Sequence, residues 1–451
     1  MNPFIFKEYD IRGIVKKDLG PEVVMDISKA IGTYLLRNGA RKVTVGRDCR
    51  LTSPSIAEIV IRGLRDAGLR VFDLGVVPSP VFYFSLFHFD ADGGVMVTAS
   101  HNPSEYNGMK IALGKTTIYG HEIQKLKELA EKKDFITALV PGERVKVDIV
   151  TPYINTLAAN IKPGQRRIKV VMDAGNGTGG VEGVPIFKRL GFEVIPLFCD
   201  MDGRFPNHHP DPTDPENLKA LIDKVAETKA DLGVSYDGDA DRLGVVDELG
   251  NIIWGDQLMI IFSRSILSEK PGATFIGEVK CSKTMYDDIA KHGGTAIMWR
   301  TGHSLIKARM KEANADLAGE MSGHIFFAHR YYGFDDAIYS SLRLLEILSK
   351  TNEPMSALLA DVPKTISTPE LRAQCPDEKK FEVVRKLTDY FKGAGYDVID
   401  IDGARVTFLD GWGLVRASNT QPMLVLRFEA NTQERLDEIR ALFEGKLKEL
   451  L

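Results

Sequence analysis

The stretch RKVTVGRDCRLTSPSIAEIVIRGLRDAGLRVFDLG, residues 41–75, contains two kinds of hydrophobic pattern. Residues 41–48 and 71–75 are short runs rich in β-branched and aromatic side chains, which is typical of buried strands. Residues 55–68 between them have apolar side chains at helical spacing. A further strand-like run, GGVMVTAS, occupies residues 93–100. This order of strand, helix and strands predicts βαβ organisation with a parallel sheet.

The same arrangement recurs twice further along the chain. The second set is IKVVMDAGNG (168–177), FEVIPLF (192–198) and ADLGVSYDGD (230–239). The third set is ATFIGEVKCS (273–282), TAIMWRTGHS (295–304) and ADLAGEMSGH (315–324). The last runs of both sets begin with Ala-Asp-Leu and carry polar residues at matching places beyond it. The repetition indicates three related units, each of which delivers one polar loop.

The chain length and the region after the third set indicate the domain organisation. At 451 residues the chain is long enough for about three domains of ordinary size, each with its own core. A stretch rich in proline and charge begins at Thr368, and the segment after it predicts strands and an amphipathic final helix. We therefore expect α/β domains at residues 1–145, 146–247 and 248–362 and a smaller α+β domain at residues 363–451.

Composition and charge exclude several classes of protein. Hydrophobic residues make up 44% and charged residues 27% of the chain, as in an ordinary globular protein. The net charge of -4 indicates no general affinity for nucleic acid. The four cysteines form no CxxC pair, which argues against a zinc site or a disulfide framework. Because no signal-like start or apolar run of membrane-spanning length occurs, we expect a cytoplasmic protein with no membrane partner.

The sequence TASHNP, residues 98–103, follows a predicted strand and turns polar at once. Ser100 is therefore expected on the loop at the carboxyl end of that strand, where open α/β sheets bind their ligands. A serine at this position could also serve only as a turn residue or a helix cap. The GxSxG elbow of hydrolases is absent from the sequence.

The sequence YDGDADR, residues 236–242, places Asp237, Asp239 and Asp241 at alternate positions. In extended backbone all three carboxylates would point the same way, and such a set of oxygen ligands suits Mg²⁺. A calcium loop is an alternative because Glu248 stands at the twelfth position counted from Asp237. Arg242 in place of glycine at the sixth position and strand-like flanks argue against that alternative. A solvated acidic turn is the remaining alternative.

Two further loops are rich in hydrogen-bonding side chains. GEMSGH, residues 319–324, offers a carboxylate, a hydroxyl and an imidazole, a set that suits sugar hydroxyls. RASNTQP, residues 416–422, combines a guanidinium, two hydroxyls and an amide, which suits the oxygens of a phosphate group. Either loop alone could be an ordinary polar turn. MDAGNGTGG, residues 172–180, lacks the ending of a P-loop and predicts a tight turn from strand to helix.

With TASHNP, DGDADR, GEMSGH and RASNTQP in this order, the chain closely resembles the α-D-phosphohexomutase superfamily, in particular its bacterial phosphomannomutase/phosphoglucomutase group. The match extends from YDIRG at Tyr9 to the RASNTQP loop. The resemblance implies three mixed α/β domains and a smaller, more mobile α+β domain around a central cleft. It also implies a mutase that moves phosphate between C1 and C6 of a hexose through a phosphoserine and a hexose 1,6-bisphosphate.

The resemblance further assigns roles to individual residues. Ser100 is the implied phosphoryl carrier, and it holds one Mg²⁺ together with Asp237, Asp239 and Asp241. The other implied catalytic residues are Arg12, His101, Lys110 and Arg242. The implied substrate-binding residues are Lys280, His303, Glu320, Ser322, His324, Arg416, Ser418, Asn419 and Thr420, of which Glu320 and Ser322 contact sugar hydroxyls and the last four anchor phosphate. Hexose 1,6-bisphosphate is the implied activator, and small sugar phosphates are the implied partners.

Two alternative functions stay open at this point. Phosphoglucosamine mutases share the serine and metal loops, but they usually begin with a sequence resembling GTDGIRG and have GEQSGH, where this chain has YDIRG and GEMSGH. A protein that binds a divalent cation or a sugar phosphate without catalysis would need no phosphate on Ser100. The residues do not select between mannose and glucose, and they predict no particular oligomeric state.

Overall fold

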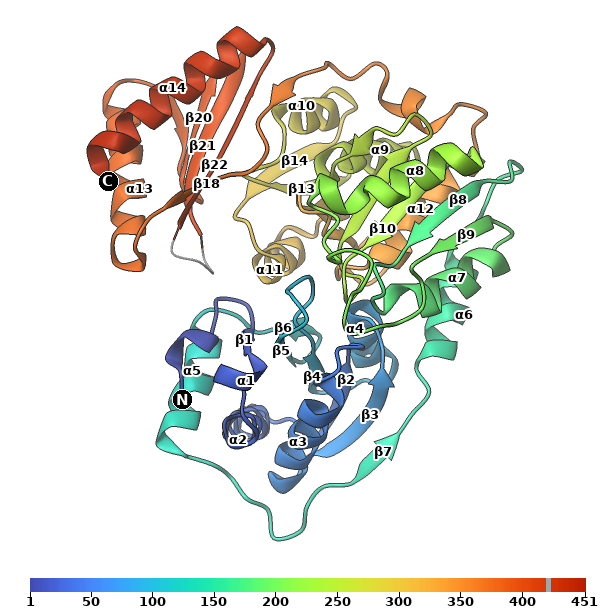
Figure 1. The fold of residues 1–451 in the computed structure, drawn as a ribbon, viewed down its shortest axis with the longest axis vertical. Coiled ribbons are helices and arrows are strands. Elements are labelled where there is room, and N and C mark those ends of the chain that lie inside the picture. The colour runs from blue at the N-terminus through green and yellow to red at the C-terminus, as the bar shows by residue number, and fades with distance from the viewer. Residues whose placement is uncertain (419–422) are drawn as a thin grey trace.

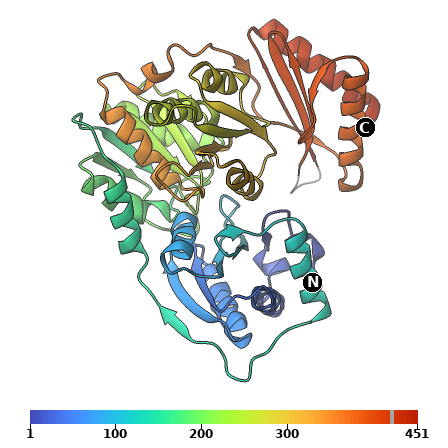
Figure 2. The ribbon, with the colours of Figure 1, turned by 180° about the vertical axis from the view of Figure 1, so that it is seen from behind.

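The computed structural model describes residues 1–418 and 423–451 of the chain. Among these residues, the strands form four sheets that follow one another along the sequence. Figures 1 and 2 show the C-terminal sheet with its helices beside the third sheet and facing the N-terminal domain. No helix in this described part is long and apolar enough to cross a membrane.

The first sheet has the order β1-β5-β4-β2-β3-β7, and β6 pairs with the last residues of β5. Strand β2 pairs in parallel with β3 and β4, and β5 returns antiparallel to β4. The strands are β1 (Ile11–Ile14), β2 (Lys42–Arg47), β3 (Arg70–Val76), β4 (Gly93–Val97), β5 (Tyr106–Leu113), β6 (Thr116–Thr117) and β7 (Arg144–Lys146). The accompanying helices are η1 (Pro3–Ile5), α1 (Val15–Asp18), α2 (Pro21–Arg37), α3 (Ser53–Asp66), α4 (Ser79–His88) and α5 (His121–Lys132).

The second sheet repeats this central pattern in the order β12-β11-β10-β8-β9. Strand β8 is parallel to β9 and β10, and β11 is antiparallel to β10. Its strands are β8 (Lys169–Asp173), β9 (Glu193–Leu197), β10 (Leu232–Tyr236), β11 (Leu243–Asp247) and β12 (Ile252–Ile253). Its helices are α6 (Val150–Asn160), α7 (Gly179–Arg189), η2 (Pro215–Leu218) and α8 (Lys219–Thr228).

The third sheet has the order β14-β13-β15-β16, again with two parallel pairs and one antiparallel return. Its strands are β13 (Thr274–Glu278), β14 (Thr295–Trp299), β15 (Leu317–Gly319) and β16 (Ile325–Phe327). Its helices are α9 (Gly255–Glu269), α10 (Lys283–Lys291), α11 (His303–Ala313), α12 (Ala337–Ser349) and η3 (Met355–Leu359).

The common topology confirms that the three units are related. The predicted parallel strands are present in each unit, and each unit also contains a strand that returns antiparallel to its neighbour. The polar loops 98–105, 237–242 and 320–324 are too short for a crossover, so each chain segment turns back beside the strand that it has just left. The result is the mixed α/β architecture that the family resemblance implies.

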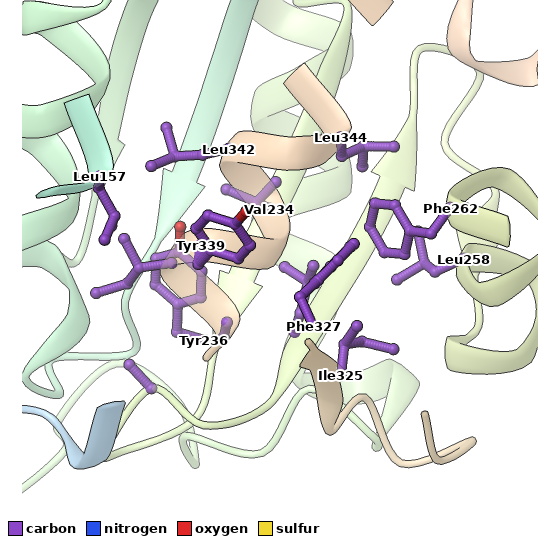
Figure 3. Close-up of a cluster of buried hydrophobic side chains, with 14 of the residues drawn as sticks. Leu157, Val234, Tyr236, Leu258, Phe262, Ile325, Phe327, Tyr339, Leu342 and Leu344 are labelled. Carbon is purple, nitrogen blue, oxygen red and sulfur yellow. The ribbon is translucent and has the colours of Figure 1, made fainter. Parts of the chain in front are cut away.

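The second and third sheets share one hydrophobic core (Figure 3). Helix α12 lies between them and contacts both β11 and β16. Side chains of α6, β10, α9, β16 and α12 meet in this core, among them Leu157, Tyr236, Phe262, Phe327 and Tyr339. The same cluster includes Phe82 and Phe84 of α4, so the core extends into the first domain. This continuous packing holds the first three sheets in fixed relative positions.

The C-terminal domain is an antiparallel sheet covered by two helices, which confirms the predicted α+β class. Its strands are β17 (Ile366–Ser367), β18 (Leu371–Gln374), β19 (Asp397–Ile399), β20 (Ala404–Phe408), β21 (Gly411–Ala417) and β22 (Met423–Ala430). Helices α13 (Asp377–Gly393) and α14 (Gln433–Leu450) pack against one face. Alternate residues on the other face contact the third domain: Arg405 donates to the carbonyls of Val279 and Cys281, and Arg427 donates to that of Lys280.

Candidate active site

The three short return loops occupy equivalent positions in the three related units, and they lie together in the structure. Ser100 of the first loop contacts Asp237 of the second. Arg242 of the second loop contacts His324 of the third. The related topology therefore places one functional loop from each sheet in a single site.

Ser100 is buried and is held in the left-handed region of backbone conformation, with φ at 50°. Its Oγ donates to Oδ2 of Asp237 over 2.6 Å and lies 3.1 Å from Nδ1 of His101. Its backbone N–H donates to Oγ1 of Thr98 over 2.9 Å. A non-glycine residue in this conformation is strained, and such strain gathers at functional sites. The hydroxyl is thereby aimed at the carboxylates of the second domain.

The acidic loop is a tight turn, and the predicted extended backbone was wrong. The N–H groups of Asp241 and Arg242 donate back to Oδ1 of Asp237 over 3.0 and 3.2 Å. Ala240 has a φ of 58° and donates its N–H to the carbonyl of Asp237. The turn, rather than strand alternation, makes the three carboxylates converge, with one oxygen from each of Asp237, Asp239 and Asp241 inside 4.8 Å.

The three carboxylates fit a hard divalent cation. All three side chains are buried. Oδ1 of Asp239 and Oδ1 of Asp241 have no hydrogen-bond partner within the described residues. Burial and the neighbouring carboxylates of Asp241 and Asp239 raise the pKa of Asp237 well above its usual range. Buried oxygen ligands with open positions and mutual repulsion are what a bound Mg²⁺ would satisfy.

Lys110 supplies one cation to this acidic group. Its Nζ donates to Oδ2 of Asp239 over 2.6 Å and to Oδ2 of Asp241 over 2.5 Å, and it lies 3.1 Å from Oγ of Ser79. Burial opposes the charge, but Asp239 and Asp241 outweigh it and raise the pKa of Lys110 well above its usual range. The ammonium group thus pairs with two of the three carboxylates, and the third, Asp237, accepts from Ser100.

Two guanidinium groups lie close to His101, the residue after Ser100. Nη1 of Arg12 donates to Oδ1 of Asn102 over 2.5 Å, and Nη2 pairs with Asp10. Nε of Arg242 donates to Nε2 of His324 over 3.1 Å. Burial, followed by Arg242 and Arg12, lowers the pKa of His101 well below its usual range. The surroundings of Ser100 are therefore suited to an anion such as a phosphate group.

The third loop presents hydrogen-bonding groups. Glu320 accepts from the N–H of Gly302 over 2.7 Å and from Oγ of Ser322 over 3.0 Å. The rings of His303 and His324 stack with centroids 5.7 Å apart. These contacts bring the four predicted residues of this region together.

Asp335 is a site residue that the sequence did not indicate. It is fully buried, and its carboxylate oxygens lie 3.1 Å from Nζ of Lys307, 3.2 Å from Nδ1 of His324 and 3.8 Å from Nδ1 of His303. Nothing in the local sequence GFDDA distinguishes it from its neighbour Asp336, which caps α12. Its role becomes visible only when the segment between β16 and α12 is placed against α11 and the third return loop.

The remaining predicted residues lie toward the C-terminal domain. Nζ of Lys280 lies 3.3 Å from Oε2 of Glu370, and Nε of Arg416 donates to Oδ2 of Asp402 over 3.0 Å. Asp402 also accepts from the N–H of Thr301, which joins this region to the third domain. Ser418 follows β21 and donates its N–H to the carbonyl of Met423. Asn419 and Thr420, which were also predicted to bind phosphate, lie outside the described residues.

Glu248 has a different role from the one a calcium loop would give it. Its carboxylate accepts from the backbone N–H of Ser356 over 3.1 Å and from the hydroxyl of the same residue. The flanks of the acidic loop are the strands β10 and β11. These contacts argue against the calcium alternative, because an EF-hand needs two flanking helices and a bidentate glutamate.

Comparisons with known proteins agree with the fold. Models of the phosphoglucomutase/phosphomannomutase α/β/α domains I, II and III match residues 3–137, 151–250 and 254–366, and the C-terminal domain model of that family matches residues 370–446. A phosphomannomutase/phosphoglucomutase of Pseudomonas putida is 48% identical over 443 residues, which cover 98% of this chain and 95% of that protein. A phosphoglucomutase of Neisseria gonorrhoeae is 45% identical over 447 residues, with 98% and 96% covered.

A solved structure of a phosphoglucomutase/phosphomannomutase family protein from Burkholderia thailandensis superimposes with a TM-score of 0.93. It is 43% identical, with 99% of this chain and 97% of that chain covered. Four domains of this kind, together with a serine that faces three buried carboxylates, define an enzyme of the phosphohexomutase class. The chain belongs to the phosphoglucomutase/phosphomannomutase family. Membership of this family implies sugar-phosphate substrates.

Proposed function

We propose that the protein interconverts the 1-phosphates and 6-phosphates of mannose and glucose, with Ser100 as phosphoryl carrier. The observation that carries the proposal is the contact of 2.6 Å between Oγ of Ser100 and the carboxylate of Asp237. Lys110 pairs with the neighbouring carboxylates, and Arg12 and Arg242 lie near His101. Phosphoryl transfer needs an aligned oxygen and charge stabilisation more than covalent help. Ser100 therefore needs no Ser-His-Asp triad for this chemistry.

The cycle starts from phosphorylated Ser100. The bond between Oγ and phosphorus breaks while a free sugar hydroxyl forms a new bond to phosphorus. The sugar hydroxyl gives up its proton to a base of the site, and Oγ of Ser100 takes up a proton as it leaves. The product is a hexose 1,6-bisphosphate. After this intermediate turns around, Oγ of Ser100 gives up its proton and forms a bond to the other phosphate, and the released sugar oxygen takes up a proton. Hexose 1,6-bisphosphate from solution loads any enzyme that has lost its phosphate.

The side chains of the site divide this work. Lys110, Arg12, Arg242 and His101 surround the transferring group and stabilise or orient its charge. Asp237, Asp239 and Asp241 would hold one Mg²⁺ beside Ser100. When bound, Mg²⁺ would supply positive charge that stabilises the phosphoryl group during transfer.

The third and fourth domains bind the rest of the substrate. Glu320 and Ser322 contact sugar hydroxyls, and Lys280, His303 and His324 line the sugar-binding region. Arg416 and Ser418, together with Asn419 and Thr420, anchor the phosphate that does not react in a given half-cycle. Arg416 is well suited to this role because a guanidinium can contact phosphate through two parallel hydrogen bonds.

The test asks whether Ser100 carries phosphate and whether turnover requires its hydroxyl. Intact-mass measurement should show one added phosphate in a fraction of the purified protein, and peptide mapping should place it on Ser100. Ser100→Ala should lower turnover by at least about 10³-fold, because the carrier is gone. Ser104→Ala, an exposed serine in the same loop, is the matched control and should turn over normally. Normal turnover of Ser100→Ala would refute the carrier role.

A further inference from the structure

A buried arginine lies behind the Ser100 loop. Arg50 follows β2 and is fully buried, and the hydrogen bonds of its guanidinium go to groups other than Asp237, Asp239 and Asp241. Its guanidinium donates to four backbone carbonyls of one segment, those of Ser100 (2.7 Å), Asn102 (2.6 Å), Pro103 (2.6 Å) and Tyr106 (3.2 Å). Its remaining N–H group, Nε, donates to Oδ2 of Asp48 over 3.1 Å. All the donor groups of the side chain therefore serve the loop or its support.

Asp48 anchors Arg50 to the first sheet. Its Oδ1 accepts from the backbone N–H of Arg50 over 3.0 Å and from the hydroxyl of Ser53. Its own N–H donates to the carbonyl of Val97, the last residue of β4. The guanidinium is thus tied to the strand that leads into the Ser100 loop. The loop and its support form one connected hydrogen-bonded unit.

The loop needs such support because Ser100 is held at a φ of 50°. A non-glycine residue in the left-handed region is unfavourable by about 1–3 kcal/mol and persists only where its surroundings hold it there. The Ser100 carbonyl is also packed against the acidic loop, since a Cβ added to Gly238 would lie 2.5 Å from that oxygen. A small rotation of the Ser100 carbonyl would therefore move both the Ser100 hydroxyl and Gly238 of the acidic loop.

The second domain closes over the arginine. The ring of Phe205 lies 5.0 Å from the guanidinium carbon of Arg50. A Cβ on Gly203 would lie 2.4 Å from the carbonyl of Cys49 and 2.7 Å from Cα of Arg50, so only glycine permits this close approach. Arg50 is consequently held between the loop that carries the serine and the domain that carries the carboxylates.

We propose that Arg50, held by Asp48, is a positioning residue for phosphoryl transfer. It fixes the backbone of residues 100–106 so that Oγ of Ser100 meets the carboxylate of Asp237 in the right direction. Arg50 acts through the loop and contacts neither substrate nor the transferred group. A lysine could not replace it, because a single ammonium group cannot reach four carbonyls arranged in a plane. The inference rests on the proposed carrier role of Ser100.

The experiment is steady-state kinetics of Arg50→Lys with glucose 1-phosphate, Mg²⁺ and glucose 1,6-bisphosphate. We expect kcat to fall by about 10²-fold while KM stays within about threefold, since misplacement of a reacting group affects turnover more than binding. Arg343→Lys is the matched control, because Arg343 is also fully buried and donates to a backbone carbonyl, that of His329, outside the site. The control should lower the melting temperature and leave kcat unchanged.

A milder second variant covers the case in which Arg50→Lys fails to fold. Asp48→Asn keeps the shape of the anchor and removes its charge, and we expect kcat to fall about tenfold at unchanged KM. A folded Arg50→Lys with the kcat of Arg343→Lys would overturn the inference. If Arg50→Lys does not fold, a folded Asp48→Asn with normal kcat would do the same.

Ser100→Ala separates the two proposals. Active Ser100→Ala would contradict the carrier role itself. Inactive Ser100→Ala beside a fully active Arg50→Lys would leave the carrier role intact and remove only the positioning role.

Discussion

At the scale of single residues, charge balance dominates the site. Asp237, Asp239 and Asp241 are buried within a few ångströms of one another, and Lys110 is the ammonium group that contacts two of them. Lys110 uses its protons on Asp239, Asp241 and Ser79, so it is better suited to stabilise charge than to accept a proton. His324 has one ring nitrogen, Nε2, beside Arg242 and the other, Nδ1, beside Asp335.

The proposed cation site gives a prediction for Asp239. Asp239→Asn removes one negative ligand, so the Mg²⁺ concentration for half-maximal activity should rise at least about tenfold, and kcat should fall. The measurement is a Mg²⁺ titration of enzyme freed of metal with EDTA, accompanied by circular dichroism to verify the fold. Asp223→Asn, an exposed aspartate on α8, serves as the control and should titrate like the wild type. Full activity of the EDTA-treated wild type without added Mg²⁺ would contradict the proposed site.

At the scale of elements, short turns bring the functional loops together. The turn before α7 has Gly175 and Asn176 at φ values of 51° and 60°, which confirms the tight strand-to-helix turn predicted from MDAGNGTGG. A Cβ on Gly177 would lie 2.7 Å from the carbonyl of Gly238. This turn therefore packs directly on the acidic loop. It supports the carboxylates without supplying a ligand itself.

Helix α7 also carries an unusual carboxyl group, which leads to a pH prediction. Glu182 is buried, its Oε2 has no hydrogen-bond partner in the part of the chain described, and burial raises its pKa from 4.5 to about 8. The folded protein therefore keeps a proton that the unfolded chain releases between these two values. The contribution of Glu182 to the free energy of unfolding is largest below pH 4.5 and decreases as the pH rises to about 8. Above that pH it is constant.

The measurement is the melting temperature of the wild type and Glu182→Gln between pH 5 and pH 9. As the pH rises to about 8, the free energy of unfolding of the wild type should decrease by at most about 1.4 kcal/mol per pH unit more than that of the variant. The melting temperature of the wild type should fall accordingly. Glu182→Gln should therefore be the more stable protein at pH 8. Glu131→Gln, on the exposed face of α5, should follow the wild type. Parallel curves for the wild type and Glu182→Gln would show that the carboxyl group is ionised in the folded protein.

At the scale of the whole molecule, related sheets supply different chemistry from equivalent positions. The first return loop carries the serine, the second the carboxylates and the third the polar groups proposed to bind sugar. The hydrophobic core shared by α4, α6, α9 and α12 holds these loops in fixed relative positions. The C-terminal domain contacts the third domain through Arg405 and Arg427, next to Lys280. Substrate phosphate and substrate sugar would therefore be bound by different parts of one assembly.

This division predicts that the enzyme accepts both glucose 1-phosphate and mannose 1-phosphate. The bisphosphate must bind in two orientations that exchange C1 and C6, so strong contacts are useful only to features kept in both. The hydroxyls at C3 and C4 roughly exchange places, whereas the C2 hydroxyl, at which the two sugars differ, moves to a new position. We expect kcat/KM values within roughly a hundredfold, because a site without a strong contact to a hydroxyl discriminates weakly.

Steady-state assays on these two sugars and on glucosamine 1-phosphate test the prediction. A ratio between glucose and mannose beyond about a thousandfold would be incompatible with it. A strong preference for glucosamine 1-phosphate would instead support the phosphoglucosamine mutase alternative.

Much of the architecture could be predicted from the sequence because hydrophobic periodicity is a local property. The strands β2, β3 and β4 and helix α3 lie where the pattern of residues 41–100 indicates them. The repeated sets predicted three related units, and dense polar runs after buried strands indicated Ser100, the aspartates and Glu320. These signals depend only on neighbours within one element or one loop, so they are readable before any packing is known.

The contacts that turn these loops into a site depend on packing between distant segments. Ser100 and Asp237 are 137 positions apart, and their distance is set by how the sheets pack against shared helices. Asp335, Asp48 and Arg50 have no local signature, because each becomes important only through a partner from another element. The tight turn at Asp237 was missed for a related reason: alternate spacing is compatible with a strand, and the N–H groups that fold back onto the carboxylate select the turn instead. Residue pattern thus determines which side chains are presented, and long-range packing determines which of them meet.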